Sequence, residues 1–187
     1  GKSVSNKLQE LETGMEWLKM MKNSAAIQAF GAGINDIEMI PLFLEHFELD
    51  FFLVAMPYTL LNQEPLEDIF PECERRGIGI IIGSPYASGV LASGSKEESK
   101  YGYATASEEM RKKVRSIEVI CEDYGIPLKA AALQFPLAHP QVSSVIPGSL
   151  SAAQVLDNIE MLKCPIPPEL WIELKHTGLL HPEAPVK

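Results

Sequence analysis

IGIIIGSPYASGVLASG, residues 78–94, changes character within a few positions. It opens on a continuous apolar run, which is typical of a parallel β-strand buried on both faces. The run stops at glycine, serine and proline, which are residue types that form tight turns at the ends of strands. In parallel α/β proteins, ligands bind at the carboxyl ends of the strands. The segment therefore predicts both a fold class and a binding edge.

Three further apolar runs have the same character and occupy residues 28–34, 51–58 and 143–146. Amphipathic helical patterns follow them, and helical patterns also occupy residues 7–22, 107–124 and 128–138. Pro136 should kink or end the last of these helices. Trp17 and Trp171 are expected to pack within helices. We therefore expect an α/β protein in which one helix is followed by four strand–helix units of a parallel sheet.

The composition disfavours several classes of protein. Hydrophobic residues make up 46% of the 187 residues and charged residues 22%, as in an ordinary globular domain. The net charge of −9 disfavours binding to nucleic acid or to an anionic membrane surface, and no apolar run reaches the roughly 18 residues of a membrane span. Cys73, Cys121 and Cys164 form no CxxC motif, which indicates free thiols in a reducing, cytoplasmic compartment. The four histidines lack ligand spacing, so we expect no metal site.

The turn after the last strand, within SVIPGSLSAAQVLDNI at residues 144–159, has two interpretations. Ser151 and Gln154 form a capping box, so the helix needs no ligand to explain its start. Alternatively, the free N–H groups and the dipole of this helix face a phosphate, which Gly148 and Ser149 allow to approach. The position of the turn at the end of a parallel strand favours phosphate binding.

Taken in chain order, these segments resemble the aldo-keto reductases. GAGIND (31–36) and MPYTLLNQ (56–63) are similar to the ends of the fifth and sixth strands of that family, and GSPYASGVLASG (83–94) to its seventh. AALQFPLAHPQVSSVIPGSLSAAQVLDN (131–158) is similar to its eighth unit. The resemblance covers about residues 10–180. It is nearest to the sugar and pyridoxal dehydrogenases, namely L-fucose or D-threo-aldose 1-dehydrogenase, pyridoxal 4-dehydrogenase and L-galactose dehydrogenase.

The resemblance implies a (β/α)8 TIM barrel, of which this chain supplies the last four strand–helix units. Residues 1–187 would form the C-terminal half of a single barrel domain, with flexible ends at 1–6 and 181–187. The N-terminal half of the same protein would be a partner, because half a barrel leaves open strand edges. The catalytic Asp, Tyr, Lys and His of the family lie on its first four strands, so we assign no catalytic residue in this chain.

The resemblance also implies a nicotinamide cofactor. The positions that match the cofactor contacts of the family are Asn35 at the nicotinamide carboxamide, Ser84, Tyr86 and Gly89 at the pyrophosphate, and Gly148, Ser149, Gln154 and Asn158 at the adenosine half. Gly148 and Gln154 stand where many members carry a basic residue that holds the 2′-phosphate of NADP. Without those charges we expect NAD to be favoured and NADP to be less well bound. Gly83 stands where many members stack a tyrosine on the nicotinamide, so that ring must be absent or supplied from elsewhere.

Two functions are compatible with these observations. In the first, the intact protein is an NAD(P)-dependent oxidoreductase, an aldose dehydrogenase that oxidises an aldose at C1, or a related alcohol or aldehyde such as pyridoxal, by hydride transfer. In the second, it is a non-catalytic regulatory or binding protein on the same scaffold. Tyr101 and Tyr103 belong either to a loop that folds over the cofactor or to an exposed loop, and the sequence does not distinguish these alternatives.

Overall fold

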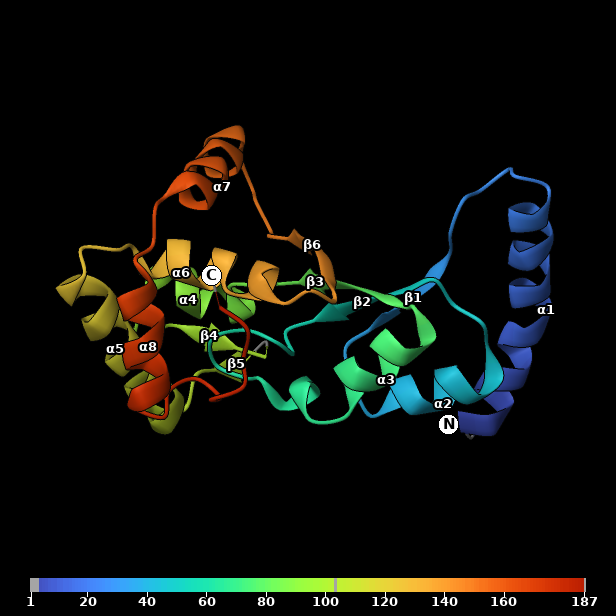
Figure 1. The fold of residues 1–187 in the computed structure, drawn as a ribbon, viewed down its shortest axis with the longest axis horizontal. Helices are drawn as coiled ribbons and strands as arrows, with labels where there is room; N and C mark the ends of the chain where they lie inside the picture. Colours follow the sequence, from blue (N-terminus) through green and yellow to red (C-terminus); the bar gives the residue numbers. More distant parts are fainter. Residues whose placement is uncertain (1–3, 103, 187) are drawn as a thin grey trace.

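The computed structural model describes residues 4–102 and 104–186, and its centre is a four-stranded parallel sheet (Figure 1). The strands are β1 (Gly31–Ile34), β2 (Phe51–Ala55), β3 (Gly79–Gly83) and β6 (Val142–Ile146), in the order β1-β2-β3-β6. Every adjacent pair is parallel, so the four carboxyl ends lie at one edge of the sheet. Each strand overlaps one of the predicted apolar runs, which confirms the predicted α/β class.

Helices precede, connect and follow the strands. The longer ones are α1 (Val4–Asn23), α2 (Met39–His46), α3 (Ile69–Arg76), α5 (Glu108–Asp123), α6 (Leu128–Gln134), α7 (Ala152–Lys163) and α8 (Pro168–His176). The shorter elements are η1 (Glu64–Leu66), η2 (Ala87–Gly89), α4 (Val90–Ser93), η3 (Pro136–Ala138) and the hairpin formed by β4 (Lys100–Tyr101) and β5 (Ala104–Thr105). As predicted from Pro136, α6 ends at Gln134 and a single 3-10 turn follows it. The sequence pattern gives no bounds for α8, which carries Trp171, and it does not predict the β4–β5 hairpin.

Local sequence explains where these helices begin and end. Ser107 caps α5, because its Oγ accepts the N–H of Met110 at 3.1 Å, and two glutamates in the first turn complement the helix dipole. α3 ends at Gly77, whose φ of 69° belongs to the left-handed region that glycine adopts without strain.

The two faces of the sheet have different environments. One face is buried and carries Phe52 and Val54 of β2 together with Ile80 and Ile82 of β3. These side chains join the core cluster with Ile40 of α2 and Phe70 of α3. The opposite face is also apolar but only partly covered, and it carries Phe51 and Leu53 of β2, Ile81 of β3 and Ile146 of β6, the last 50% exposed. Among the described residues, β1 and β6 are the edge strands of this sheet, and an apolar face between two edge strands is suited to further packing.

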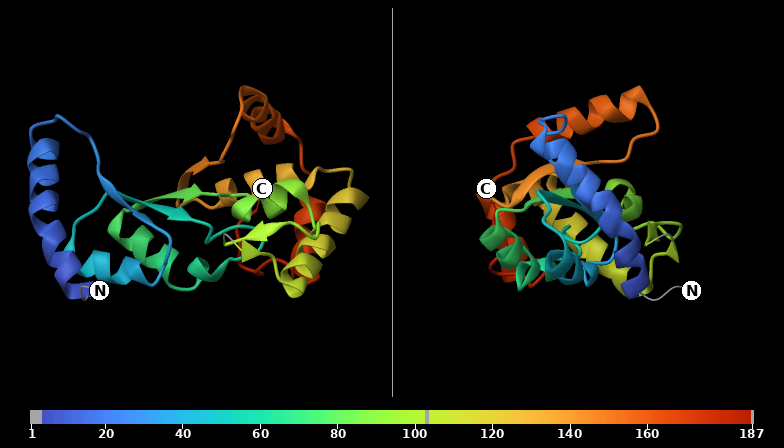
Figure 2. Two further views of the ribbon diagram at one scale, coloured as in Figure 1. Left: turned by 180° about the vertical axis from the view of Figure 1, so that it is seen from behind. Right: turned by 90° about the vertical axis from the view of Figure 1, so that its right-hand side faces the viewer.

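The helices α1 and α7 stand away from the sheet. Along the long axis, α1 lies at one end and α5 and α8 lie at the other (Figure 1). Extended segments join α7 to the body (Figure 2). Both α1 and α7 carry exposed apolar side chains, namely Leu11, Trp17 and Met20 on α1 and Val155, Leu156, Ile159 and Leu162 on α7. The expectation that Trp17 packs is therefore wrong in this chain, because its residue is 57% exposed. Trp171 is buried, as predicted.

The described residues also limit the sites and segments that the fold contains. Within 4–102 and 104–186, no helix combines the length and the apolar character of a membrane span. In the same residues no three His, Cys, Asp or Glu side chains come together as a possible metal site.

After α8, the N–H of His181 donates to Oε1 of Gln63 at 3.2 Å and Ala184 is buried. The mobility predicted for 1–6 and 181–187 stays a prediction, and Tyr103 lies outside the described residues.

Phe135 offers a test of the core. Its fully buried ring lies 5.1 Å from the ring of Tyr58 and 6.2 Å from that of Trp171, measured between centroids. We expect Phe135→Ala to lower the free energy of unfolding by about 3–5 kcal/mol, because it leaves a cavity among these rings. Ile172→Ala is the control, since Ile172 is 63% exposed, and should change it by less than about 0.5 kcal/mol. Urea unfolding measures both variants, and equal midpoints would contradict this packing.

Candidate functional site

A cavity of about 350 Å³ opens beside the carboxyl ends of β3 and β6, and we call it the β3–β6 cavity. Its lining residues are Ser84, Tyr86, Ser88, Gly89, Ala92, Lys129, Gly148, Leu150, Gln154 and Asn158. Six of these ten are among the eight residues that the sequence predicts as cofactor contacts. The structure therefore brings together loops that lie far apart in the chain.

The loop after β3 reaches the cavity through an unusual backbone. Ser84, Ala87 and Ser88 have φ values of 53°, 47° and 59°, in the left-handed region that residues other than glycine rarely adopt. Such conformations cost free energy and persist where the surrounding structure enforces them, often at binding sites. Here they turn the chain within a few residues, and Ser84, Ser88 and Gly89 of this loop line the cavity together with Tyr86.

Two hydrogen bonds connect Tyr86 and Asn158, which line the β3–β6 cavity, with Ser149. The hydroxyl of Tyr86 donates to Oδ1 of Asn158 at 2.7 Å, and Nδ2 of Asn158 donates to Oγ of Ser149 at 3.0 Å. Both Tyr86 and Asn158 are buried. Burial, together with the negative charge of Asp157, raises the pKa of Tyr86, so its hydroxyl stays a neutral donor. These two hydrogen bonds fix the orientation of the Asn158 amide and add Ser149 to the predicted residues that meet at this site.

The predicted capping box at the start of α7 is present, with one difference. Oγ of Ser151 accepts the N–H of Gln154 at 3.3 Å, as expected. Oε1 of Gln154 accepts the N–H of Leu150 at 2.6 Å, which is one residue before the cap. The Gln154 side chain therefore holds the turn after Gly148 as well as lining the cavity. Phosphate binding at this turn stays a prediction.

Lys129 is a candidate that the sequence pattern does not single out. It lies in the first turn of α6, and its Nζ is 5.3 Å from the centroid of the Tyr86 ring. The same Nζ pairs with the carboxylate of Asp157 on α7. The only sequence feature that indicates Lys129 is its charge in a helix that is otherwise apolar nearly all round. Lys129 is a site residue because the fold places α6 beside the cavity.

Asn35 is the one predicted residue that lies apart. It lines a second cavity, of about 280 Å³, that we call the β1–β2 cavity and whose other lining residues are Ala55, Met56, Pro57, Asn62 and Tyr101. Ser88 lies between the two cavities, because its Oγ contacts Sδ of Met56 at 3.4 Å and accepts the N–H of Gly102 at 3.1 Å. Both cavities open at the same edge of the sheet, as the parallel strands require.

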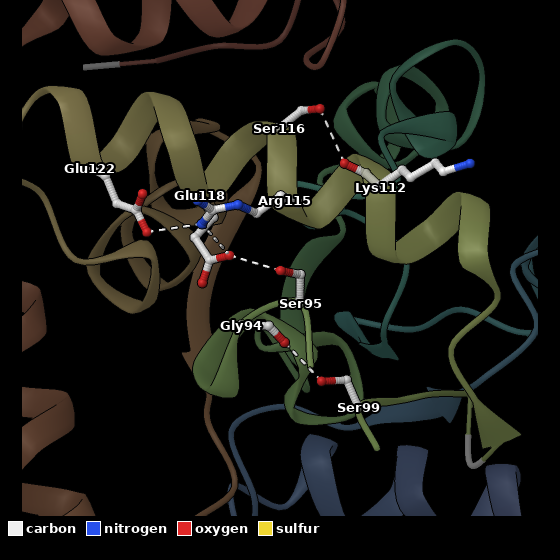
Figure 3. Close-up of polar contacts among 8 residues, drawn as sticks. All are labelled: Gly94, Ser95, Ser99, Lys112, Arg115, Ser116, Glu118 and Glu122. Carbon is white, nitrogen blue, oxygen red and sulfur yellow. Dashed lines mark hydrogen bonds and ion pairs between the residues drawn. The ribbon is translucent and has the colours of Figure 1, made fainter. Parts of the chain in front are cut away.

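The loop that carries the β4–β5 hairpin is fixed to α5 through Glu118 (Figure 3). Oε2 of Glu118 accepts the hydroxyl of Ser95 at 2.9 Å and Nη1 of Arg115 at 3.1 Å. Gly94 has a φ of 83°, and a Cβ at this position would lie 2.4 Å from Oε1 of Glu118. Oγ of Ser99 donates to the carbonyl of Gly94 at 2.8 Å. These contacts hold the hairpin where Tyr101 lines the β1–β2 cavity.

A larger cavity, of about 570 Å³, lies at the amino ends of the strands, between α1 and the end of α2. None of the eight predicted residues lines it. Its position away from the carboxyl ends makes it a poor candidate for the binding site of a parallel α/β protein.

Comparison with known proteins gives the site a context. The family model described as the Aldo/keto reductase family matches residues 4–177. The chain is 35% identical over 167 residues to the pyridoxal 4-dehydrogenase of Microbacterium luteolum, which covers 89% of this chain and 49% of that protein. It is 33% identical over 164 residues to the D-threo-aldose 1-dehydrogenase of a Pseudomonas species, which covers 87% of this chain and 50% of that protein. The chain thus spans about half the length of these curated relatives.

The fold has a counterpart among solved structures. The apo form of an aldo-keto reductase from Bacillus halodurans superposes with a TM-score of 0.70 and 22% identity, covering all of this chain (100%) and 61% of that one. At this identity the likeness concerns the fold alone. It confirms the predicted TIM-barrel class, and the two dehydrogenases confirm the predicted resemblance to the sugar and pyridoxal branch.

Glu118 provides a test of how the hairpin loop is held. We expect Glu118→Ala to raise amide hydrogen exchange across residues 95–106 about tenfold, because the loop loses its hydrogen bond to α5. Glu122→Ala is the matched control, since Glu122 pairs with the same Arg115 at 3.0 Å without touching Ser95. Exchange measured by mass spectrometry should separate the two variants. Equal exchange of this segment in both would contradict the anchoring role.

Proposed function

The chain belongs to the aldo/keto reductase family, and we propose that it is the C-terminal half of an NAD-dependent dehydrogenase of small sugars or aldehydes. The observation that carries the proposal is the convergence of seven predicted residues at the β3–β6 cavity, six of them lining it and Ser149 bonded to Asn158. Such convergence is what a binding site built from two distant loops requires.

The β3–β6 cavity suits the adenosine and phosphate portion of the cofactor. Gly89 and Gly148 line it without side chains, which leaves space for a phosphate close to the backbone. The positive end of the α7 dipole lies beside Ser149, and anions bind favourably at such helix starts. The buried amide of Asn158, oriented by Tyr86, offers a fixed polar group for recognition. Tight turns, a helix start and one oriented amide together fit a nucleotide better than a sugar alone.

The β1–β2 cavity suits the nicotinamide end. Asn35, directly after β1, and Asn62, in the segment between β2 and η1, both line it. An amide can both donate to and accept from the carboxamide of a nicotinamide ring. Tyr101 provides an aromatic face in the same cavity, which is where we place the ring that Gly83 cannot supply. The bound cofactor would accept the hydride that leaves the substrate carbon.

The residues that handle the substrate proton would come from the N-terminal half. We propose that this half pairs with the free edges of β1 and β6 and covers the partly exposed apolar face of the sheet, which would also bury apolar side chains of α1 and α7. The names of the two dehydrogenase relatives support a sugar or pyridoxal as substrate of the intact protein. The three free cysteines fit a reducing compartment, and we propose the cytoplasm.

Binding of the cofactor by the intact protein tests the site. We expect Asn158→Ala to weaken NAD⁺ binding at least about tenfold, because the oriented amide and its bond to Ser149 are lost. Asn23→Ala, on the exposed end of α1, is the control and should leave the dissociation constant unchanged. Calorimetric titration measures both. Equal affinity of the two variants would contradict the assignment of the β3–β6 cavity.

Turnover distinguishes the dehydrogenase from a non-catalytic binding protein on the same scaffold. We expect the intact protein to form NADH with at least one of L-fucose, L-galactose and pyridoxal, because this chain resembles dehydrogenases of that branch. The near-ultraviolet absorbance of NADH follows the reaction. Tight NAD⁺ binding without turnover of any of the three would favour the binding protein.

A further inference from the structure

The charge of the β3–β6 cavity depends on two residues. Among the ten residues that line it, all within the described part of the chain, Lys129 alone carries a positive charge. Its side chain lines the cavity and is only 18% exposed, and its Nζ lies 5.3 Å from the centroid of the Tyr86 ring. A lysine held in this way is a ready partner for an anion.

Asp157 forms an ion pair with that lysine. It precedes Asn158 on α7, and its carboxylate forms an ion pair with Nζ of Lys129. The two groups come from different helices, α6 and α7, which are neighbours in the fold. Because the pair carries no net charge, Lys129 has little attraction left for a ligand, and the Asp157 carboxylate repels a second anion at the same place.

The two nicotinamide cofactors differ by one phosphate on the 2′ oxygen of the adenosine ribose. A site that accepts this phosphate needs a cation to compensate its charge, whereas a site for the free hydroxyl does not. Gly148 and Gln154 on the same wall carry no charge, so Lys129 is the one lining group that could compensate the phosphate.

We propose that Asp157 determines the cofactor preference of this protein by neutralising Lys129, which disfavours the 2′-phosphate of NADP. The inference rests on the proposed function, because it assumes that the adenosine half lies in the β3–β6 cavity. It adds to that function a pair of specificity residues, one of which lies on α6, outside both loops that the sequence predicts to contact the cofactor.

Asp157→Asn in the intact protein tests the inference, with calorimetric titrations of NAD⁺ and NADP⁺. The wild type should bind NAD⁺ more tightly. The variant frees Lys129 while keeping the size of the side chain, so its affinity for NADP⁺ should rise about tenfold relative to NAD⁺. Asp157→Asn combined with Lys129→Met should lose this gain, since the released cation is then absent. Asp123→Asn, at the exposed end of α5, is the matched control and should leave the ratio unchanged.

The outcomes separate the inference from the function on which it rests. A rise in NADP⁺ affinity that depends on Lys129 supports it. An unchanged ratio in variants that bind NAD⁺ normally would overturn the inference alone, as would an equal gain for both cofactors, which would place Lys129 at the shared pyrophosphate. Binding of neither cofactor by the wild type would overturn the proposed function and the inference with it.

Discussion

The parallel pairing of β3 with β6 is the constraint on which the site depends. It places Gly83 beside Ile146, so the loop after β3 and the turn after β6 leave the sheet at the same point. Tyr86 and Asn158 are 72 positions apart in the chain, yet they form a hydrogen bond across the cavity for this reason. The pairing of β1 with β2 does the same for Asn35 and Met56. A sheet with antiparallel neighbours would send alternate loops to opposite edges and divide the site.

The same sheet is also incomplete in its packing. Its buried face holds Phe52 and Ile80, whereas Ile146 on the other face is half exposed. α1 and α7 carry exposed apolar side chains outside the core. Burial of apolar surface is worth about 25 cal/mol per Å², so a further segment that covers this face would gain substantial stability. The N-terminal half that we propose would fill this role and would also bring the catalytic groups to the carboxyl edge.

Much of this arrangement can be predicted from the sequence, and the limits have physical causes. Continuous apolar runs identify the strands because parallel strands are buried on both faces, and Pro136 marks the end of α6 because it cannot continue a helix. The sequence gives no distances between loops, so it does not separate Asn35 from the other predicted residues. Lys129 joins the site only through the packing of α6 against α7, which local periodicity does not specify. The exposure of Trp17 likewise depends on what packs against α1, and local sequence does not determine this.

A structure of the intact protein with NAD⁺ bound would show directly whether the carboxyl edge of the sheet holds the cofactor. The expected result is that the adenosine half lies in the β3–β6 cavity beside Asn158, that the nicotinamide lies in the β1–β2 cavity beside Asn35, and that β1 and β6 each pair with a further strand. A nucleotide bound away from the carboxyl edge of the sheet would contradict it, and so would free edges at β1 and β6.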